Sequence, residues 1–140
     1  MSRITVGVDG SPEARAALLF ALEEAQLRGA GVEAVLAYSP LPYLADDVVL
    51  RQEEITEGQA EELLRKEVEP AAAGFPGISV TTRAVVGPPA RTLIEMSEDS
   101  DLLVVGSRGR GGFSGLLLGS VSQQCVHHAT CPVVVVPRAA

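Results

Sequence analysis

Segments with strand-like patterns alternate with segments that have helical patterns along the whole chain. Apolar runs typical of strands are separated by glycine and proline from stretches whose apolar residues recur at helical spacing. This alternation predicts an α/β fold, a doubly wound parallel sheet with helices on both faces. Residues 39–49 are expected to be irregular. The expected strands cover residues 3–9, 32–38, 78–86, 101–105 and 133–136, and the expected helices cover residues 12–28, 51–73, 90–97 and 120–129.

The size and charge of the chain exclude several classes of protein. Its 140 residues suit one domain, which we expect to span residues 1–140. Acidic residues outnumber basic ones by 18 to 11, and the net charge of −7 argues against general binding to nucleic acids or anionic membranes. No apolar run is long enough to span a bilayer, and the first twenty residues lack a signal-peptide pattern. The two cysteines are too few for a secreted disulfide scaffold, so we expect a cytoplasmic protein.

A glycine-rich segment between the fourth expected strand and the last expected helix carries the clearest chemical signal. Gly106 and Gly109 are followed, after nine residues, by Gly119 and Ser120. Glycines let backbone N–H groups approach an anion, and the start of a helix presents unpaired amides with a partial positive charge. Ser120 and Ser122 add hydroxyl groups. The pattern therefore predicts a phosphate-binding loop.

Other glycine motifs do not fit this segment. A P-loop requires a lysine where Ser120 stands, a dinucleotide fingerprint requires a glycine where Ser114 stands, and a nucleophile elbow requires a glycine where Leu116 stands. Residues 101–140 hold one acid and three arginines, so the chain is locally positive here. A surface loop whose glycines serve turns stays open as an alternative, with Ser120 as a helix cap in a capping box with Gln123.

The whole chain resembles the universal stress protein family, in the branch that binds adenine nucleotides. The three glycines and the serine of the loop match that branch's pattern of Gly, two residues, Gly, nine residues, Gly, then Ser or Thr. The opening Val6–Ser11 resembles the family's first strand and turn, and Cys131–Val136 resembles its last strand. The resemblance implies the strand order 3-2-1-4-5. It also implies a stress-response regulator that binds ATP, with Mg²⁺ as a candidate companion ion, at the carboxyl ends of strands one and four.

The resemblance also implies which residues contact the nucleotide. Asp9 would meet the ribose or a cation, and Tyr38 would meet the adenine. As alternatives, Asp9 suits a turn or cap, Tyr38 suits a buried core position, and Arg108 suits a solvated loop. The nucleotide-binding residues implied by the resemblance are Val8, Asp9, Tyr38, Val105, Gly106, Arg108, Gly109, Gly119, Ser120, Val121 and Ser122.

The last expected strand is apolar on both faces. The last strand of a doubly wound sheet often lies at an edge, and a bare apolar edge favours association. We therefore expect a homodimer through this strand, and burial within one chain is the alternative. The expected interface residues are Val133, Val134, Val135 and Val136.

No catalytic residue is expected, because Asp9 is the only acid that the pattern puts at the ligand end. A slow ATPase on the same fold and a dimeric interaction module that binds no nucleotide remain alternatives. A phosphoacceptor receiver domain would need several acids at the first strand and a lysine near the fifth, and the sequence has neither. No metal site is expected, since none of the usual paired spacings links Cys125, His127, His128 and Cys131.

Overall fold

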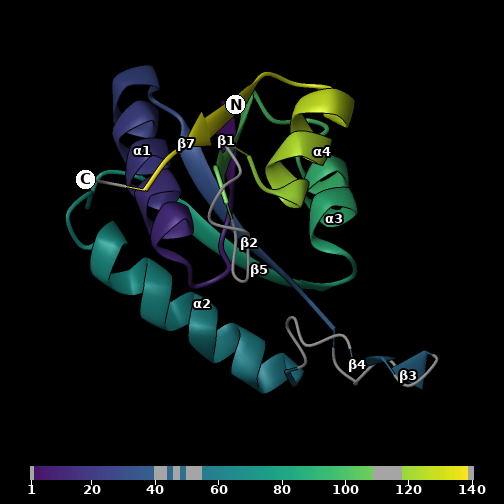
Figure 1. Ribbon diagram of the computed structural model, residues 1–140. Coiled ribbons are helices and arrows are strands. Elements are labelled where there is room, and N and C mark those ends of the chain that lie inside the picture. The colour runs from purple at the N-terminus through teal and green to yellow at the C-terminus, as the bar shows by residue number, and fades with distance from the viewer. Residues whose placement is uncertain (1, 40–43, 46–47, 50–54, 109–117, 139–140) are drawn as a thin grey trace.

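The computed structural model of the chain describes residues 2–39, 44–45, 48–49, 55–108 and 118–138. Within them, five parallel strands form one sheet with the order β5-β2-β1-β6-β7 (Figure 1). Numbered by their sequence within this sheet, the strands have the order 3-2-1-4-5, so the predicted fold class and strand order are confirmed. The strands are β1 (Arg3–Gly7), β2 (Gly31–Tyr38), β5 (Val80–Val86), β6 (Leu102–Gly106) and β7 (Val133–Val136).

Helices cover both faces of the sheet, as the alternation of the sequence predicts (Figure 1). The first two helices in the chain pack on one face and the next two on the other. The first helix begins where expected, because Ser11 Oγ accepts a hydrogen bond from the Ala14 N–H at 3.1 Å. The helices are α1 (Pro12–Arg28), α2 (Glu57–Ala72), α3 (Pro89–Met96) and α4 (Ser120–His128).

Two details differ from the expectation. The second helix begins at Glu57 rather than Arg51, because Thr56 and Gln59 form a reciprocal capping box. Thr56 Oγ1 accepts from the Gln59 N–H at 3.1 Å, and Gln59 Oε1 accepts from the Thr56 N–H at 2.9 Å. The segment expected to be irregular contains a short antiparallel pair, formed by β3 (Leu44–Ala45) and β4 (Val48–Val49).

Two apolar cores hold the layers together. On one face, Ile4 and Val6 of β1 pack with Leu22 of α1 and with apolar residues of α2. On the other face, Leu103 of β6 packs with Cys125 of α4 and with residues of α3. Each fully buried Leu or Ile side chain contributes about 1.5–3 kcal/mol by leaving water. β2 and β6 are almost wholly buried because helices cover both faces of the sheet. This packing holds the ends of both strands in fixed positions.

β7 forms one edge of the sheet, and its residues are half-buried. The Leu103 N–H donates to the Pro132 carbonyl, and the Ser107 N–H donates to the Val136 carbonyl. Because backbone groups alternate in direction along a strand, the N–H and C=O groups of Val133 and Val135 point away from β6. Among the described residues, no helix combines the length and the apolar character needed to cross a membrane.

Candidate functional site

The central strands β1 and β6 mark the point where the chain reverses its direction across the sheet. From β1 the chain reaches β2 through α1 on one face, and it reaches β6 from β5 through α3 on the other (Figure 1). In doubly wound sheets this switch point opens a crevice at the carboxyl ends of the two strands, where ligands bind. β1 leads into Val8 and Asp9, and β6 leads into Ser107 and Arg108. The topology therefore brings these two predicted groups of residues to one edge.

Hydrogen bonds join the two ends of the glycine-rich segment. The Ser107 carbonyl accepts from the Gly119 N–H at 2.6 Å and from the Ser122 hydroxyl at 2.9 Å. The Ser107 N–H donates to the Val136 carbonyl at 2.7 Å and so ties this junction to β7. The end of β6 and the start of α4 are therefore held together. Gly109, the remaining glycine of the predicted pattern, lies outside the described residues.

The first turn of α4 begins at this junction. Gly119 is the N-cap residue, and no side-chain cap hydrogen bond forms at this end of the helix. Ser120 is the first helical residue and is exposed, so the alternative in which Ser120 caps the helix is wrong. Ser122 is buried, and its hydroxyl hydrogen-bonds to the carbonyl oxygens of Ser107 and Gly119. The first-turn amides of α4 therefore supply the partial positive charge that suits an anion.

Asp9 lies in the turn that leads from β1 into α1. Its Oδ1 atom accepts from the Ser11 N–H at 2.9 Å. Gly10 has a φ of 83°, a left-handed conformation that glycine adopts without steric cost. The turn role left open by the sequence is therefore present, while Ser11 caps α1, and the half-exposed Asp9 stands at the carboxyl edge of the sheet.

Tyr38 ends β2 and is 4% exposed. It belongs to the same apolar core as Val8, which agrees with the core alternative for this tyrosine. Burial raises the pKa of the Tyr38 hydroxyl, and the negative charges of Glu57 and Glu61 raise it further. The other two apolar residues predicted at the site, Val105 and Val121, lie in the core between the sheet and the pair α3 and α4.

A second acid, which the sequence analysis missed, lies at this edge. Glu13, in the first turn of α1, is 4% exposed. Its Oε2 atom is 3.7 Å from Nη2 of Arg108 and 3.6 Å from Nε of Arg138. The expectation that Asp9 is the only acid at the ligand end is therefore wrong. Gly106 allows the approach, because a Cβ at this position would lie 2.7 Å from the Cβ of Glu13.

The cysteines and histidines near α4 do not form a metal centre in the described part of the chain, which holds no group of three or more such ligands. Burial raises the pKa of the Cys125 thiol to about 11, and Cys131 adds to the shift. Since the thiolate is the form that binds metals, Cys125 is a poor ligand. Both cysteines are free thiols.

Comparisons with known proteins all lead to one family. The family model described as "Universal stress protein family" matches residues 1–137. Universal stress protein Rv2005c of Mycobacterium tuberculosis is 37% identical over 137 residues, and the match covers 94% of this chain and 44% of the relative. The chain thus spans less than half the length of this relative.

Solved structures share the fold over nearly the whole chain. Universal stress protein UspA from Lactobacillus plantarum has a TM-score of 0.80 at 26% identity, over 96% of this chain and 97% of that one. A universal stress protein in complex with cAMP has a TM-score of 0.75 at 27% identity, over 99% and 98%. The Archaeoglobus fulgidus protein in complex with dAMP has a TM-score of 0.61 at 26% identity, over 97% and 98%.

Proposed function

This chain belongs to the universal stress protein family, and we propose that it binds ATP and acts as a cytoplasmic, dimeric stress-response regulator. One observation carries the proposal for ATP: the uncapped first turn of α4 meets the glycine-rich segment at the switch point of the sheet. The cAMP and dAMP bound to two structural relatives support an adenine nucleotide as the ligand. The two free thiols suit the cytoplasm.

In the proposed complex, each part of ATP has its own set of residues. Asp9 accepts hydrogen bonds from the ribose or helps to hold a Mg²⁺ ion that accompanies the phosphates. Tyr38, Val8 and Val105 border the adenine. The phosphates meet Arg108 and backbone N–H groups of the loop and of α4, and the N–H of Ser122 is one of these groups. The proposed phosphate-binding residues are Gly106, Arg108, Gly109, Gly119, Ser120, Val121 and Ser122.

We favour binding over hydrolysis because Asp9 and Glu13, the acids that the structure describes at the start of α1 beside the glycine-rich segment, already have partners. Asp9 accepts from a backbone N–H of the α1 turn, and Glu13 is paired with two arginines. A general base must be able to take a proton from the attacking water, and neither carboxylate is arranged for that task.

Saturating ATP is expected to stabilise the purified protein against heat. At 100 times the dissociation constant, a ligand that binds only the folded state adds about 2.7 kcal/mol to the free energy of unfolding. The Ser120→Asp variant should lose most of this gain, because its carboxylate repels phosphate while still suiting the start of α4. Thermal unfolding with and without millimolar ATP measures both effects, and mass spectrometry of the denatured protein detects ATP that co-purifies.

Gln124→Asp is the matched control, since it adds the same charge at an exposed position one turn farther along α4. This variant should keep the ATP-dependent gain. If ATP leaves the melting temperature of the unsubstituted protein unchanged, the proposal fails and the interaction module that binds no nucleotide is favoured.

The proposed dimer forms through β7, whose outer edge carries the backbone groups of Val133 and Val135. We expect Val135→Pro to give a monomer, because proline removes an outward N–H without breaking a hydrogen bond to β6. Thr82→Pro makes the equivalent change at the opposite edge, since the bonds of Ser79 and Gly87 to β2 direct the Thr82 N–H outward. Light scattering after size-exclusion chromatography should report a dimer for this control. A dimer that survives in Val135→Pro contradicts an interface through β7.

A further inference from the structure

One buried carboxylate gathers two arginines from distant parts of the chain beside the glycine-rich segment. Arg108 follows β6, and Arg138 comes two residues after the end of β7. Both guanidinium groups meet the same oxygen, Oε2 of Glu13, at 3.7 and 3.6 Å. The Glu13 side chain is 5% exposed, whereas those of Arg108 and Arg138 are 29% and 61% exposed. The carboxylate is thus shielded, and the cations face outward.

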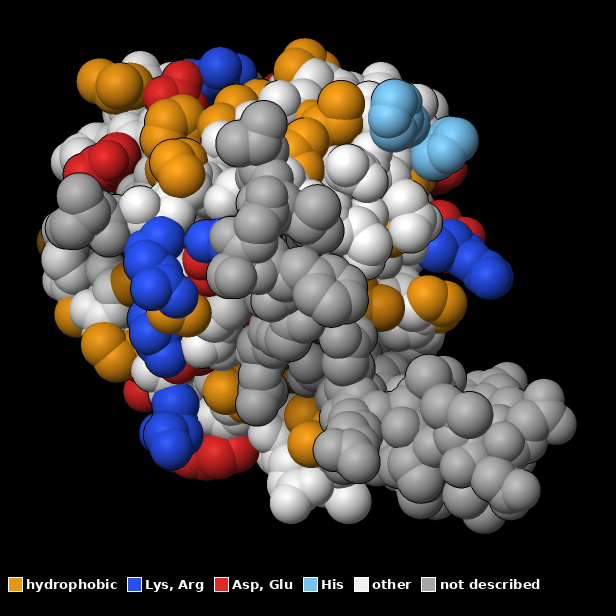
Figure 2. Space-filling model, viewed as in Figure 1, with side chains coloured by type: hydrophobic (Ala, Val, Ile, Leu, Met, Phe, Trp, Pro, Cys, Tyr) orange, Lys and Arg blue, Asp and Glu red, His pale blue; other side chains and the backbone are white. Residues whose placement is uncertain are grey.

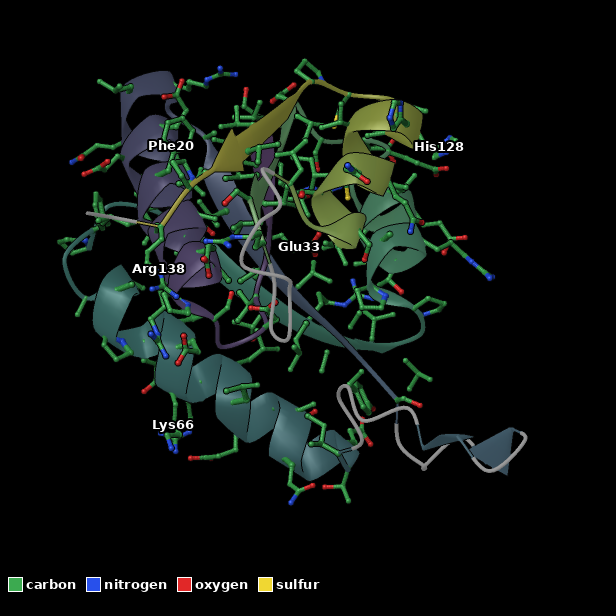
Figure 3. The ribbon with its side chains drawn as sticks, in the orientation of Figure 1. Phe20, Glu33, Lys66, His128 and Arg138 are labelled. Atoms are coloured by element: carbon green, nitrogen blue, oxygen red, sulfur yellow. The ribbon has the colours of Figure 1, made fainter. Side chains whose placement is uncertain are left out.

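Basic side chains outnumber acidic ones in this cluster. Among the described residues it joins two arginines to one glutamate, although the chain as a whole carries −7. The exposed Arg28 and Arg65, in contrast, are paired with glutamates of their own helices. Figure 2 shows Lys and Arg side chains gathered along one side of this view, and Figure 3 shows Arg138 beside α1 with Lys66 below it on α2.

The position of Arg138 follows from the sheet. Val136 pairs with Gly106 in the β6–β7 ladder, and its carbonyl accepts from the Ser107 N–H. The end of β7 therefore lies next to Gly106 and Ser107, where the glycine-rich segment begins. Arg138 extends from there to Glu13, across the same edge where α1 begins.

We propose that Arg138 is a second phosphate-binding side chain, and that Glu13 is the positioning residue that holds Arg138 and Arg108 as a pair for the polyphosphate tail of the nucleotide. The inference rests on the proposed binding of ATP at this edge. Guanidinium groups suit phosphate oxygens because they offer several planar donors, and two of them can serve successive phosphates. Glu13 itself contacts no ligand in this proposal. It fixes the two cations so that less of their freedom is lost on binding.

The first test compares the affinities of the Arg138→Gln variant for ATP and for adenosine by titration calorimetry. We expect roughly tenfold weaker ATP binding, the scale of one charge-assisted hydrogen bond, and unchanged adenosine binding. Arg28→Gln is the matched control, because it removes the same charge from the opposite end of α1. An ATP affinity of Arg138→Gln equal to that of this control overturns the role of Arg138.

The second test separates positioning from a merely structural role. In a Glu13→Gln background the arginines lose their shared anchor, so the Arg138→Gln substitution should weaken ATP binding by less than threefold instead of about tenfold. If the two substitutions are simply additive, Glu13 does not position Arg138. If the unsubstituted protein binds adenosine but not ATP, the phosphate role of Arg138 falls while an adenine site survives. If it binds neither, the proposed function fails and this inference fails with it.

Discussion

The Gly106→Ala variant is expected to lose about 1–3 kcal/mol of its free energy of unfolding, the usual effect of overpacking a tight site. The new Cβ would lie 2.7 Å from the Cβ of Glu13, 2.8 Å from its backbone carbon and 3.0 Å from the backbone nitrogen of Ala14. Two of these three contacts are with the backbone, so no side-chain rotation relieves them. The first turn of α1 must move away from β6. Urea denaturation of the variant and of the unsubstituted protein measures the difference.

The matched control is Gly77→Ala, because nothing lies within 4 Å of a Cβ built at Gly77. Its stability should change by less than about 0.5 kcal/mol, as is usual for surface substitutions. A Gly106→Ala variant as stable as this control would show that α1 adapts easily. If such a variant nevertheless lost ATP binding, Gly106 would serve the ligand alone rather than the packing of α1.

Gly106 illustrates what the sequence pattern contains and what it lacks. The spacing of the loop identifies this glycine as a candidate phosphate contact, because local motifs depend only on neighbours in the chain. Its approach to Glu13 depends on how α1 packs on β6, and the two residues are far apart in the sequence. Element order and strand order were predictable because the alternation of strands and helices runs along the whole chain and leaves few topologies open.

Glu13 shows why part of the site was missed. An acid in the first turn of a helix has an ordinary explanation, because it complements the helix dipole. A signal was nevertheless present: Glu13 directly follows the predicted helix start at Pro12, and that start must face the same edge as the glycine-rich segment. Its partner Arg138 lies beyond the last strand, where no motif points to it. Some helix boundaries were missed for similar reasons: α2 begins at Glu57 rather than Arg51, and the cap of α4 is Gly119 rather than Ser120.

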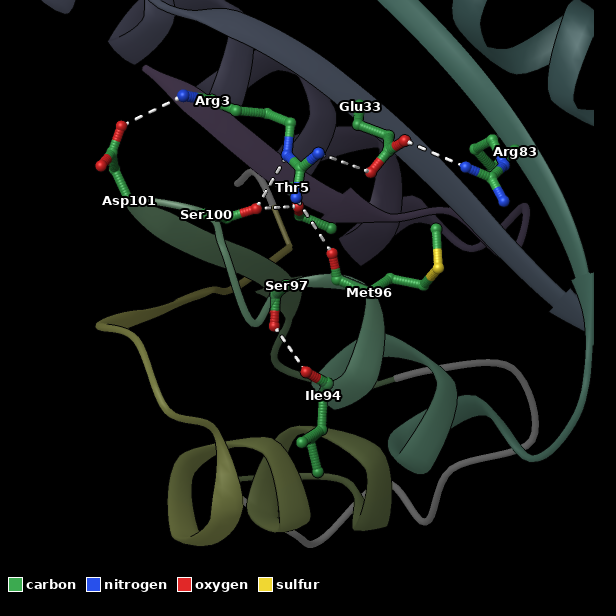
Figure 4. Close-up of polar contacts among 9 residues, drawn as sticks. All are labelled: Arg3, Thr5, Glu33, Arg83, Ile94, Met96, Ser97, Ser100 and Asp101. Carbon is green, nitrogen blue, oxygen red and sulfur yellow. Dashed lines mark hydrogen bonds and ion pairs between the residues drawn. The ribbon is translucent and has the colours of Figure 1, made fainter. Parts of the chain in front are cut away.

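Removing both Arg3 and Arg83 is expected to cost about 2–3 kcal/mol of stability, because it takes away the two countercharges that the structure describes at the buried carboxylate of Glu33. Glu33 lies in β2 with its side chain 9% exposed. Its Oε1 is 3.9 Å from Arg3 Nη1, and its Oε2 is 3.8 Å from Arg83 Nη1 (Figure 4). Oε1 accepts no hydrogen bond from the described residues, so these two cations are its main compensation. Breaking buried ion pairs typically costs 3–5 kcal/mol, and the partial exposure of both arginines reduces that value.

The decisive comparison adds Glu33→Met to the Arg3→Met and Arg83→Met double variant. An apolar side chain of similar volume removes the uncompensated charge, so the triple variant should regain most of the lost stability in urea denaturation. Arg3 also donates to Ser100 Oγ at 3.1 Å and to the Met96 carbonyl at 3.4 Å, and the triple variant cannot restore these bonds. If it stays as unstable as the double variant, those hydrogen bonds rather than the charge of Glu33 account for the loss. If the double variant loses nothing, water compensates Glu33 without either arginine.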